Sequence, residues 1–143
     1  MIVLHGVEQF TAAITEKVAQ MRAATRLATG TALHLIERRA KEKLGERSHQ
    51  PGTPTPSGPG EPPALITGNL RRSIKVTGPD PEGASGWKGS VGPTAVQSRI
   101  QELGGVARGR TLPPRPYLRP AFEEMRGEIT AVFRTAWTKA ILK

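Results

Sequence analysis

Apolar residues recur every three or four positions through the first third of the chain, which is the spacing of one face of a helix. The stripe consists of Val7, Phe10, Ile14, Val18, Met21, Ala28, Ala32, Leu35, Ile36, Ala40 and Leu44. Alanine, the strongest helix former, is abundant here, so the pattern predicts a helix over 7–44 of about 55 Å at ~1.5 Å per residue. Gly30 interrupts the pattern and predicts a bend or break. A helix this long either kinks or packs partly on a neighbouring subunit.

A second apolar stripe at helical spacing predicts another long helix over 118–142. It consists of Leu118, Phe122, Met125, Ile129, Phe133, Ala136 and Ala140. Pro120 is compatible with this start, because the first turn of a helix does not need the amide that proline lacks.

Between the two stripes the apolar period shortens to two. After a turn and a short helical turn at 67–73, alternation over Ser73–Thr77 predicts a half-buried strand. The dense turn residues of Gly78–Gly83 predict a long connection. Trp87–Gly92 is then the returning strand of an antiparallel hairpin.

A short helical pattern follows over Thr94–Leu103, with Val96, Ile100 and Leu103 on one face. Thr94 is its candidate N-cap, and Gly104-Gly105 ends it. The stretch 106–112 is either irregular or a third short strand.

Proline and glycine dominate the segment at about 45–64, which excludes helix and paired strand because proline has no amide donor. It is expected to be an exposed loop within a single domain spanning 1–143. The predicted fold is therefore α+β: a long N-terminal helix, a small antiparallel sheet (a hairpin plus a possible third strand), a short middle helix and a long C-terminal helix.

The amino-acid composition weakly indicates that the chain forms an oligomer. Only 36% of the residues are hydrophobic and 4% aromatic, so the isolated chain buries little apolar area, and a subunit interface would stabilise it. The net charge of +9 attracts polyanions or acidic protein surfaces. Arginines of the first helix (Arg22, Arg26, Arg38 and Arg39) either face DNA or pair with acidic neighbours.

Sites for catalysis or cofactors are not predicted. The three histidines, His5, His34 and His49, are far apart in the sequence, and His34 is expected on a helix surface. The one adjacent acidic pair, Glu123-Glu124, opens the last helix, where the helix dipole favours negative charge. Phosphate-binding glycine loops are missing, and the chain has no cysteine to form a disulfide or a thiolate metal site. We therefore expect a protein that is not an enzyme and binds no cofactor or metal.

The start of the chain has no signal-peptide pattern, and no apolar stretch is long enough to span a membrane. We therefore expect the chain to be made and to fold in a reducing cytoplasm.

Three segments in series carry a resemblance: Leu65-Ile-Thr-Gly-Asn-Leu-Arg-Arg-Ser-Ile74, Val96-Gln-Ser-Arg-Ile-Gln-Glu-Leu-Gly-Gly105 and Pro113-Pro-Arg-Pro-Tyr-Leu-Arg-Pro-Ala-Phe122. They are similar to the neck, or head–tail joining, proteins of long-tailed bacteriophages, often labelled minor tail components. That family shows Thr-Gly-x-Leu-Arg-x-Ser-Ile, then Tyr-Ala-x-x-x-Glu-x-Gly, then x-Arg-Pro-Phe-Leu-x-Pro-Ala. Two departures are Tyr117 in place of the commoner Phe, and Val96-Gln97 where Tyr-Ala is often found.

The resemblance implies a structural virion protein, made in the cytoplasm of a host bacterium and located in the virion neck. It would form a homo-oligomeric ring that connects the portal or head-completion proteins to the tail terminator or tail tube, and lets genomic DNA pass without sequence specificity. A tail terminator ring is the alternative role, and a basic DNA-binding protein is a further one. The residues that flank the matched motifs are the candidate partner or subunit contacts: Arg71, Arg72, Arg115, Tyr117 and Arg119.

Overall fold

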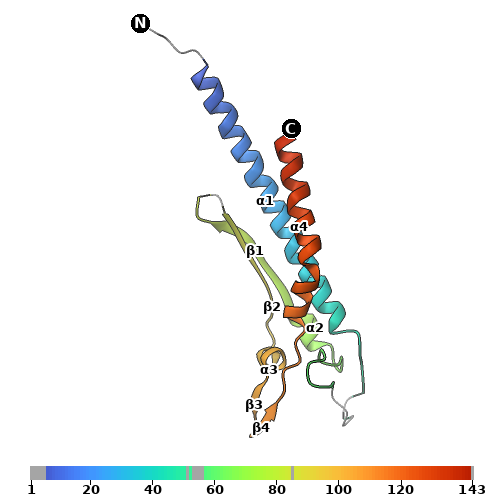
Figure 1. Cartoon of the computed structure of the whole chain (residues 1–143). Coiled ribbons are helices and arrows are strands. Elements are labelled where there is room, and N and C mark those ends of the chain that lie inside the picture. The colour runs from blue at the N-terminus through green and yellow to red at the C-terminus, as the bar shows by residue number, and fades with distance from the viewer. Residues whose placement is uncertain (1–5, 51, 53–56, 85, 143) are drawn as a thin grey trace.

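Two long helices, α1 (Val7–Lys43) and α4 (Leu118–Leu142), form the spine of the molecule. The computed structural model describes residues 6–50, 52, 57–84 and 86–142. The two helices lie side by side and antiparallel (Figure 1). At one end Lys17 Nζ donates to the carbonyl oxygen of Ile141 (3.2 Å), and at the other Lys43 Nζ pairs with Glu124 Oε1 (2.6 Å).

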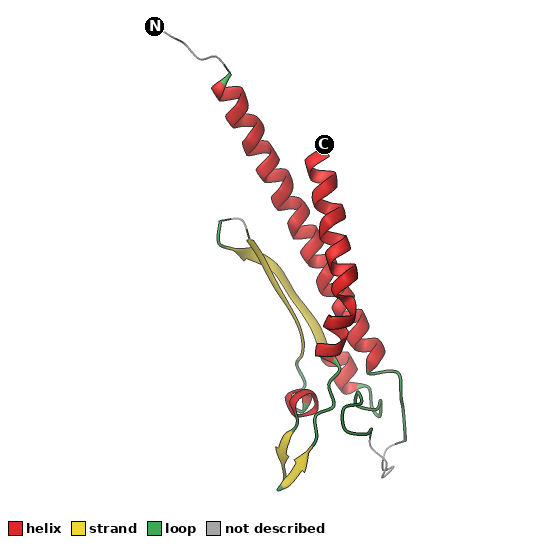
Figure 2. Cartoon of the chain, viewed as in Figure 1, coloured by secondary structure: helices red, strands yellow, loops and turns green. Residues whose placement is uncertain are grey.

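A β-hairpin of β1 (Ile74–Glu82) and β2 (Gly86–Pro93) extends along α1, on another side of that helix from α4 (Figure 2). Trp87 holds it there: Nε1 donates to the Arg22 carbonyl oxygen (3.0 Å), and the Arg26 guanidinium lies 5.5 Å from the centre of the Trp87 ring. Further along, a Cβ at Gly89 would collide with the Leu33 side chain. Glycine at this position therefore lets Leu33 pack directly on the strand backbone.

The short elements gather at the end of the molecule where α1 ends and α4 begins, which we call the junction end (Figure 1). They are α2 (Asn69–Ser73), α3 (Ser98–Leu103), β3 (Gly105–Ala107) and β4 (Arg110–Leu112). Strands β3 and β4 pair only with each other, as a second small hairpin.

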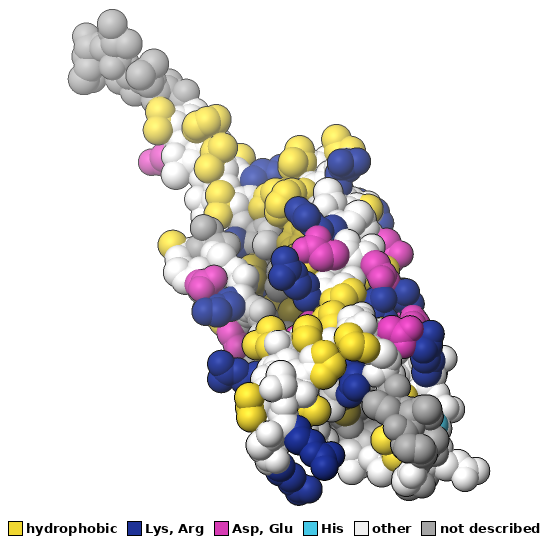
Figure 3. All heavy atoms as spheres, turned by 60° about the horizontal axis from the view of Figure 1, so that its bottom comes forward, with side chains coloured by type: hydrophobic (Ala, Val, Ile, Leu, Met, Phe, Trp, Pro, Cys, Tyr) yellow, Lys and Arg dark blue, Asp and Glu magenta, His cyan; other side chains and the backbone are white. Residues whose placement is uncertain are grey.

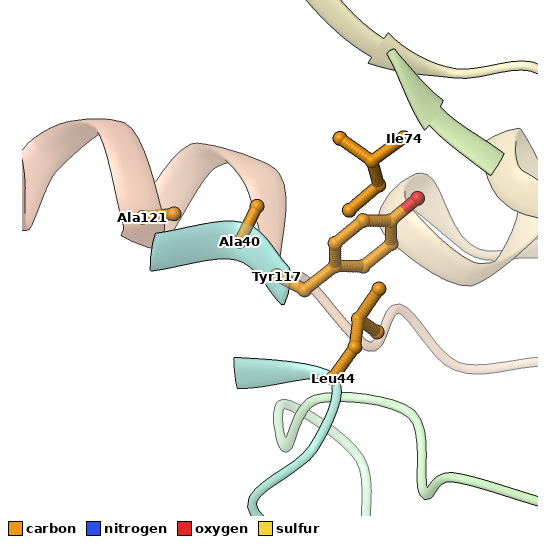
Figure 4. Close-up of a cluster of buried hydrophobic side chains, with 5 residues drawn as sticks. All are labelled: Ala40, Leu44, Ile74, Tyr117 and Ala121. Atoms are coloured by element: carbon orange, nitrogen blue, oxygen red, sulfur yellow. The ribbon is translucent and has the colours of Figure 1, made fainter. Parts of the chain in front are cut away.

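The core lies at this same end, where α1, β1 and α4 meet (Figure 4). Its buried members are Ala40, Leu44, Ile74, Tyr117 and Ala121. Tyr117 and Ile74 are the large side chains among the fully buried described residues. The opposite end of α1 contributes nothing to this cluster, so burial in the molecule is uneven along its length.

The predicted α+β fold is confirmed, as are the two long helices. The expected bend at Gly30 is wrong, because α1 continues through it without interruption. A Cβ at Gly30 would lie 3.8 Å from Cδ of Pro79, so this glycine faces the hairpin that packs there. It marks a site of close packing and not a break.

The turn expected over Gly78–Gly83 is also wrong. Strand β1 runs to Glu82, with an irregular register between Thr77 and Asp80, and Glu82 pairs with Gly86. A two-stranded hairpin leaves one edge of each strand unpaired, so prolines without an amide donor are tolerated in it.

Two details of the middle segment differ as well. The short helix begins at Ser98, and Thr94 does not cap it: Thr94 Oγ1 and N–H both donate to the Ser73 carbonyl oxygen. The possible third strand at 106–112 is instead the separate β3–β4 hairpin.

The loop expected at about 45–64 is described in part, since residues 51 and 53–56 lie outside the described residues. What is described makes an isolated bridge between Ser48 and Leu65, and a bond from Gly60 N–H to the Pro114 carbonyl oxygen (2.9 Å). No helix or ladder strand occupies the described part of this loop.

Candidate functional site

The carboxylate of Glu102 joins α3 to the start of α4. Its Oε2 accepts the N–H groups of Tyr117 (2.9 Å) and Leu118 (3.0 Å), and its Oε1 accepts that of Arg119 (2.9 Å). The first N–H groups of a helix have no partner within the helix, and its positive dipole end favours an anion. Glu102 thus caps α4 from a different element, which fixes where the helix begins.

A second backbone bond reinforces this junction. The Arg115 N–H donates to the Gln101 carbonyl oxygen (2.6 Å), two residues before Tyr117, the first residue whose N–H Glu102 binds. The prolines around Arg115 restrict the approach of the chain to a narrow range of φ. Contacts with α3 therefore fix the path of the chain from Pro113 to Leu118.

Tyr117 anchors the same junction from the inside. Its ring lies, fully buried, between Leu44, which directly follows α1, and Ile74 of β1 (Figure 4). Burial, and secondarily the charge of Glu102, raises the pKa of the Tyr117 hydroxyl, which stays neutral at physiological pH. That hydroxyl has no hydrogen-bond partner among the described residues. Tyr117 is thus a core residue, and its side chain is not on the surface where a partner would bind.

The three segments that carry the family resemblance therefore meet at one place. Ile74, from the first segment, packs on Tyr117 of the third, and Glu102 of the second binds the backbone of the third. Glu102 and Gly104 have the Glu-x-Gly spacing of the family pattern; counting back from Glu102 puts Gln97-Ser98, and not Val96-Gln97, at its Tyr-Ala position. Residues from three separate parts of the sequence therefore form one structural unit.

The candidate arginines surround this unit in different settings. Arg71 and Arg72 are exposed on α2, where Arg72 Nη2 donates to Asn69 Oδ1 (2.6 Å). Arg115 is half-buried, and its Nε is enclosed without a hydrogen-bond partner among the described residues. Arg119 is exposed. None of these four makes an ion pair with a described carboxylate, so their charges are free for another molecule.

Arg119 borders an open, mostly apolar groove of about 660 Å³ at the junction end. Leu103 and Phe122 are among its lining residues, with 66% and 44% of their surface exposed. An exposed leucine and phenylalanine beside a free arginine are the kinds of side chain that protein interfaces favour.

The sequence reasoning missed three further arginines at this end: Arg99 on α3, and Arg108 and Arg110 at the β3–β4 hairpin. Positive φ at Arg108 (51°) and Gly109 (73°) gives the hairpin a tight two-residue tip of the kind seen in type I′ turns. The sequence feature that could have indicated this hairpin is Arg108-Gly109-Arg110 between two short segments that contain apolar residues. Figure 3 shows this end turned toward the viewer, with Lys and Arg side chains across it and at its lower edge.

Three of the four candidate arginines of α1 have partners within the chain. Arg39 Nε pairs with Glu124 Oε2 (2.6 Å), and Arg38 Nε lies 3.7 Å from Glu42 Oε1. Arg26 covers the Trp87 ring. Of the two alternatives for these residues, pairing within the subunit applies to Arg38 and Arg39, whereas Arg22 makes no ion pair with a described carboxylate.

His34 lies on the helix surface as expected, with Nδ1 3.0 Å from Glu37 Oε2, while His5 lies outside the described residues. Across 6–50, 52, 57–84 and 86–142, no three His, Cys, Asp or Glu side chains are grouped to hold a metal ion. Within the same ranges, none of the helices is apolar and long enough to cross a membrane.

Comparison of the chain with protein-family models, with curated proteins and with solved structures gave no match in any of the three.

Proposed function

We propose that this chain is a structural subunit of the neck of a tailed bacteriophage. In this role a ring of identical copies connects the portal or head-completion proteins to the tail terminator or tail tube, and DNA passes through it. The protein performs no catalysis and needs no cofactor. Its place is the virion, at the head–tail interface, after synthesis in the host bacterium.

The observation that carries this proposal is the meeting of the three resembling segments at the junction end. Resemblance in short motifs is weak support when the motifs are scattered over a fold. Here Glu102 binds the backbone of Tyr117, Leu118 and Arg119, and Tyr117 packs on Ile74. A shared pattern that builds one physical unit is better support for a shared role than three unrelated matches would be.

The surface of the molecule also fits an assembly subunit. Large apolar side chains remain exposed at both ends, including Phe10 (67%), Val106 (70%) and Leu142 (80%). Exposed apolar surface of this kind usually marks contacts with other proteins. The junction end adds free arginines, which suit ion pairs and planar hydrogen bonds with a neighbouring subunit.

Analysis of purified particles tests this function. Virions of the phage or prophage whose genome encodes the chain are purified, their proteins identified by mass spectrometry, and the chain located by electron microscopy with a bound antibody fragment. We expect label at the head–tail junction. Label at the junction between tail tube and terminator would favour the tail terminator role, and absence from mature virions would overturn the proposal.

Direct binding of DNA is the second candidate function, and a specific observation favours it. Arg99, Arg108 and Arg110 lie near one another in the sequence and the fold, and none pairs with a described carboxylate. Arginines at a projecting hairpin tip bind phosphates without reading sequence. This candidate is compatible with the neck role, since DNA passes the ring.

A further inference from the structure

The face of α1 that packs on α4 continues beyond the point where α4 ends. Thr25 Oγ1 accepts a hydrogen bond from Trp137 Nε1 (3.0 Å), and Lys17 reaches the Ile141 carbonyl near the last turn of α4. Helix α1 begins ten residues earlier, at Val7, and at ~1.5 Å per residue this leaves about 15 Å of helix without a partner. Figure 1 shows α1 extending past the C-terminal end of α4.

This unpartnered part of α1 is apolar along one side. Val7, Phe10, Ile14 and Val18, spaced by three, four and four residues, form what we call the projecting stripe. Their exposed fractions are 59%, 67%, 50% and 51%, whereas Ala28 and Ala32, on the continuation of the same face, are buried against the rest of the molecule. The stripe is therefore an apolar helix face of the kind that packs in a core, but no other described element of the molecule packs on it.

A groove with the opposite shape lies between α1 and α4, which we call the alanine groove. It has a volume of about 620 Å³ and is lined by Ala23, Ala24, Leu27, Ala136, Ala140 and Leu142, together with Gln20 and Lys139. It continues along both helices past Ala28 and Ala131. Alanines leave space between two helices, and bulky side chains from a third helix fill such space.

The charges of the two surfaces are also complementary. Residues 7–18, which span the projecting stripe, carry Glu8, Glu16 and Lys17 and so have a net charge of −1. The charged residue that lines the alanine groove is Lys139. This net negative charge is attracted to the ammonium group of Lys139 at the groove of another copy, which offsets part of the repulsion between two chains of net charge +9.

We propose that the projecting stripe of one copy packs into the alanine groove of a second copy. The two surfaces cannot meet within one molecule, because residues 7–18 and 20–27 belong to the same uninterrupted helix. They are different surfaces, so the contact is heterologous, and repeating it joins copies into a closed ring or an open chain. This inference rests on the proposed ring for its biological context and names the surfaces that build it.

Disulfide trapping tests the contact directly. The chain has no cysteine, so introduced cysteines report only on themselves. Ile14→Cys and Ala136→Cys variants of the full chain are mixed under mild oxidation. We expect a disulfide-linked dimer that contains one copy of each variant. Ala12→Cys, on the opposite side of the same segment, serves as the matched control and is expected to form much less of it.

A complementation experiment provides an independent readout in solution. The stripe variant Phe10→Gln/Ile14→Gln and the groove variant Leu27→Glu change exposed residues, so both are expected to fold, which circular dichroism checks. By sedimentation velocity we expect each variant alone to associate at least ten-fold more weakly than the unchanged chain. An equimolar mixture retains one intact stripe and one intact groove and should form a 1:1 dimer. Ala12→Gln should associate like the unchanged chain.

Other outcomes overturn the proposal. Efficient self-crosslinking of Ile14→Cys alone would mean that two stripes pack on each other. An effect of the stripe variant without an effect of Leu27→Glu would leave the groove out of the contact. A chain that stays monomeric would show that the stripe has another occupant. These tests measure contact between copies, whereas the proposed function is tested by the location of the chain in the virion. The proposed contact can therefore be wrong while the proposed function is right, and the reverse.

Discussion

Glu102 shows how one side chain can decide the position of a helix. Most helix caps are supplied by the residue just before the helix, but here that residue is Tyr117, whose side chain is buried in the core. Glu102 on α3 accepts three successive N–H groups at 2.9–3.0 Å instead. The consequence is that α4, α3 and the segment between them are stabilised together.

Removing this carboxylate should therefore destabilise the whole chain. For Glu102→Ala we expect a loss of about 2 kcal/mol in the free energy of unfolding, since caps contribute roughly 0.5–2 kcal/mol and uncompensated N–H groups cost about 1–3. Glu102→Gln should lose less, because one oxygen remains as acceptor. Urea denaturation measures both. Glu128→Ala, which removes an α4 glutamate without a described partner, should change stability little, and an equal loss in both variants would argue against the cap.

Tyr117 has a buried hydroxyl without a hydrogen-bond partner among the described residues. An unsatisfied buried polar group costs about 1–3 kcal/mol, so Tyr117→Phe should leave stability unchanged or raise it. Phenylalanine is also the commoner residue at this position in the resembling family. Tyr117→Ala opens a cavity in the core and should cost about 3–5 kcal/mol. Thermal unfolding compares the two; a clear loss in Tyr117→Phe would show that the hydroxyl is hydrogen-bonded.

At the scale of elements, helical spacing predicted the helices well and turn chemistry predicted the hairpin badly. The α4 stripe marks its element because all its members except Phe122 are buried or half-buried. Residues Gly78 to Pro81 read as a turn because glycine and proline favour turns in isolation. Tertiary packing decides otherwise: Pro79 lies against Gly30 of α1, and the strand continues to Glu82. A single sequence does not show which prolines will meet a glycine on a distant helix.

The pairing of α1 with α4 should depend on pH through Glu124. Lys43 and then Arg39, both hydrogen-bonded to this carboxylate, hold its pKa below the ordinary value of 4.5. A lowered folded-state pKa means that the ionised form stabilises the fold above the ordinary pKa, and that this contribution is lost as the pH falls through the lowered value.

The variant Glu124→Gln should accordingly be less stable than the unchanged chain at neutral pH, and the difference should shrink below about pH 4.5. Glu124 is partly exposed, so a loss of roughly 0.5–1 kcal/mol, the upper range for surface pairs, is expected. Denaturation at several pH values measures it. The neighbouring Glu123→Gln breaks a pair with Arg126 on the same helix and serves as the control. A difference that is constant with pH would contradict the ion-pair explanation.

At the scale of the whole molecule, the candidate site was only partly predictable. The motif segments were found because their residues are close in sequence, whereas Tyr117, predicted as a partner or subunit contact, is a core residue. Glu102 was not singled out, because its partners are backbone groups 15–17 residues away, which leave no side-chain signature. The α1 stripe was predicted as one apolar face, without its exposed part being located, since periodicity shows that a face is apolar and not what covers it.

The free charge at the junction end leads to the last prediction. If the β3–β4 tip contacts DNA phosphates, the full chain should bind double-stranded DNA without sequence preference, and log affinity should fall linearly with log salt. Each phosphate contact contributes about 0.9 to that slope, so Arg108→Asn/Arg110→Gln should reduce it by about 2. Asparagine is chosen at 108 because it tolerates the positive φ of this residue.

The double variant Arg38→Gln/Arg126→Gln removes the same charge from residues paired with glutamates and should leave the slope nearly unchanged. Fluorescence anisotropy over a salt series measures both. Equal slopes for the two variants would mean that net charge alone attracts DNA, and the arginines of the hairpin tip would then be assigned to protein partners.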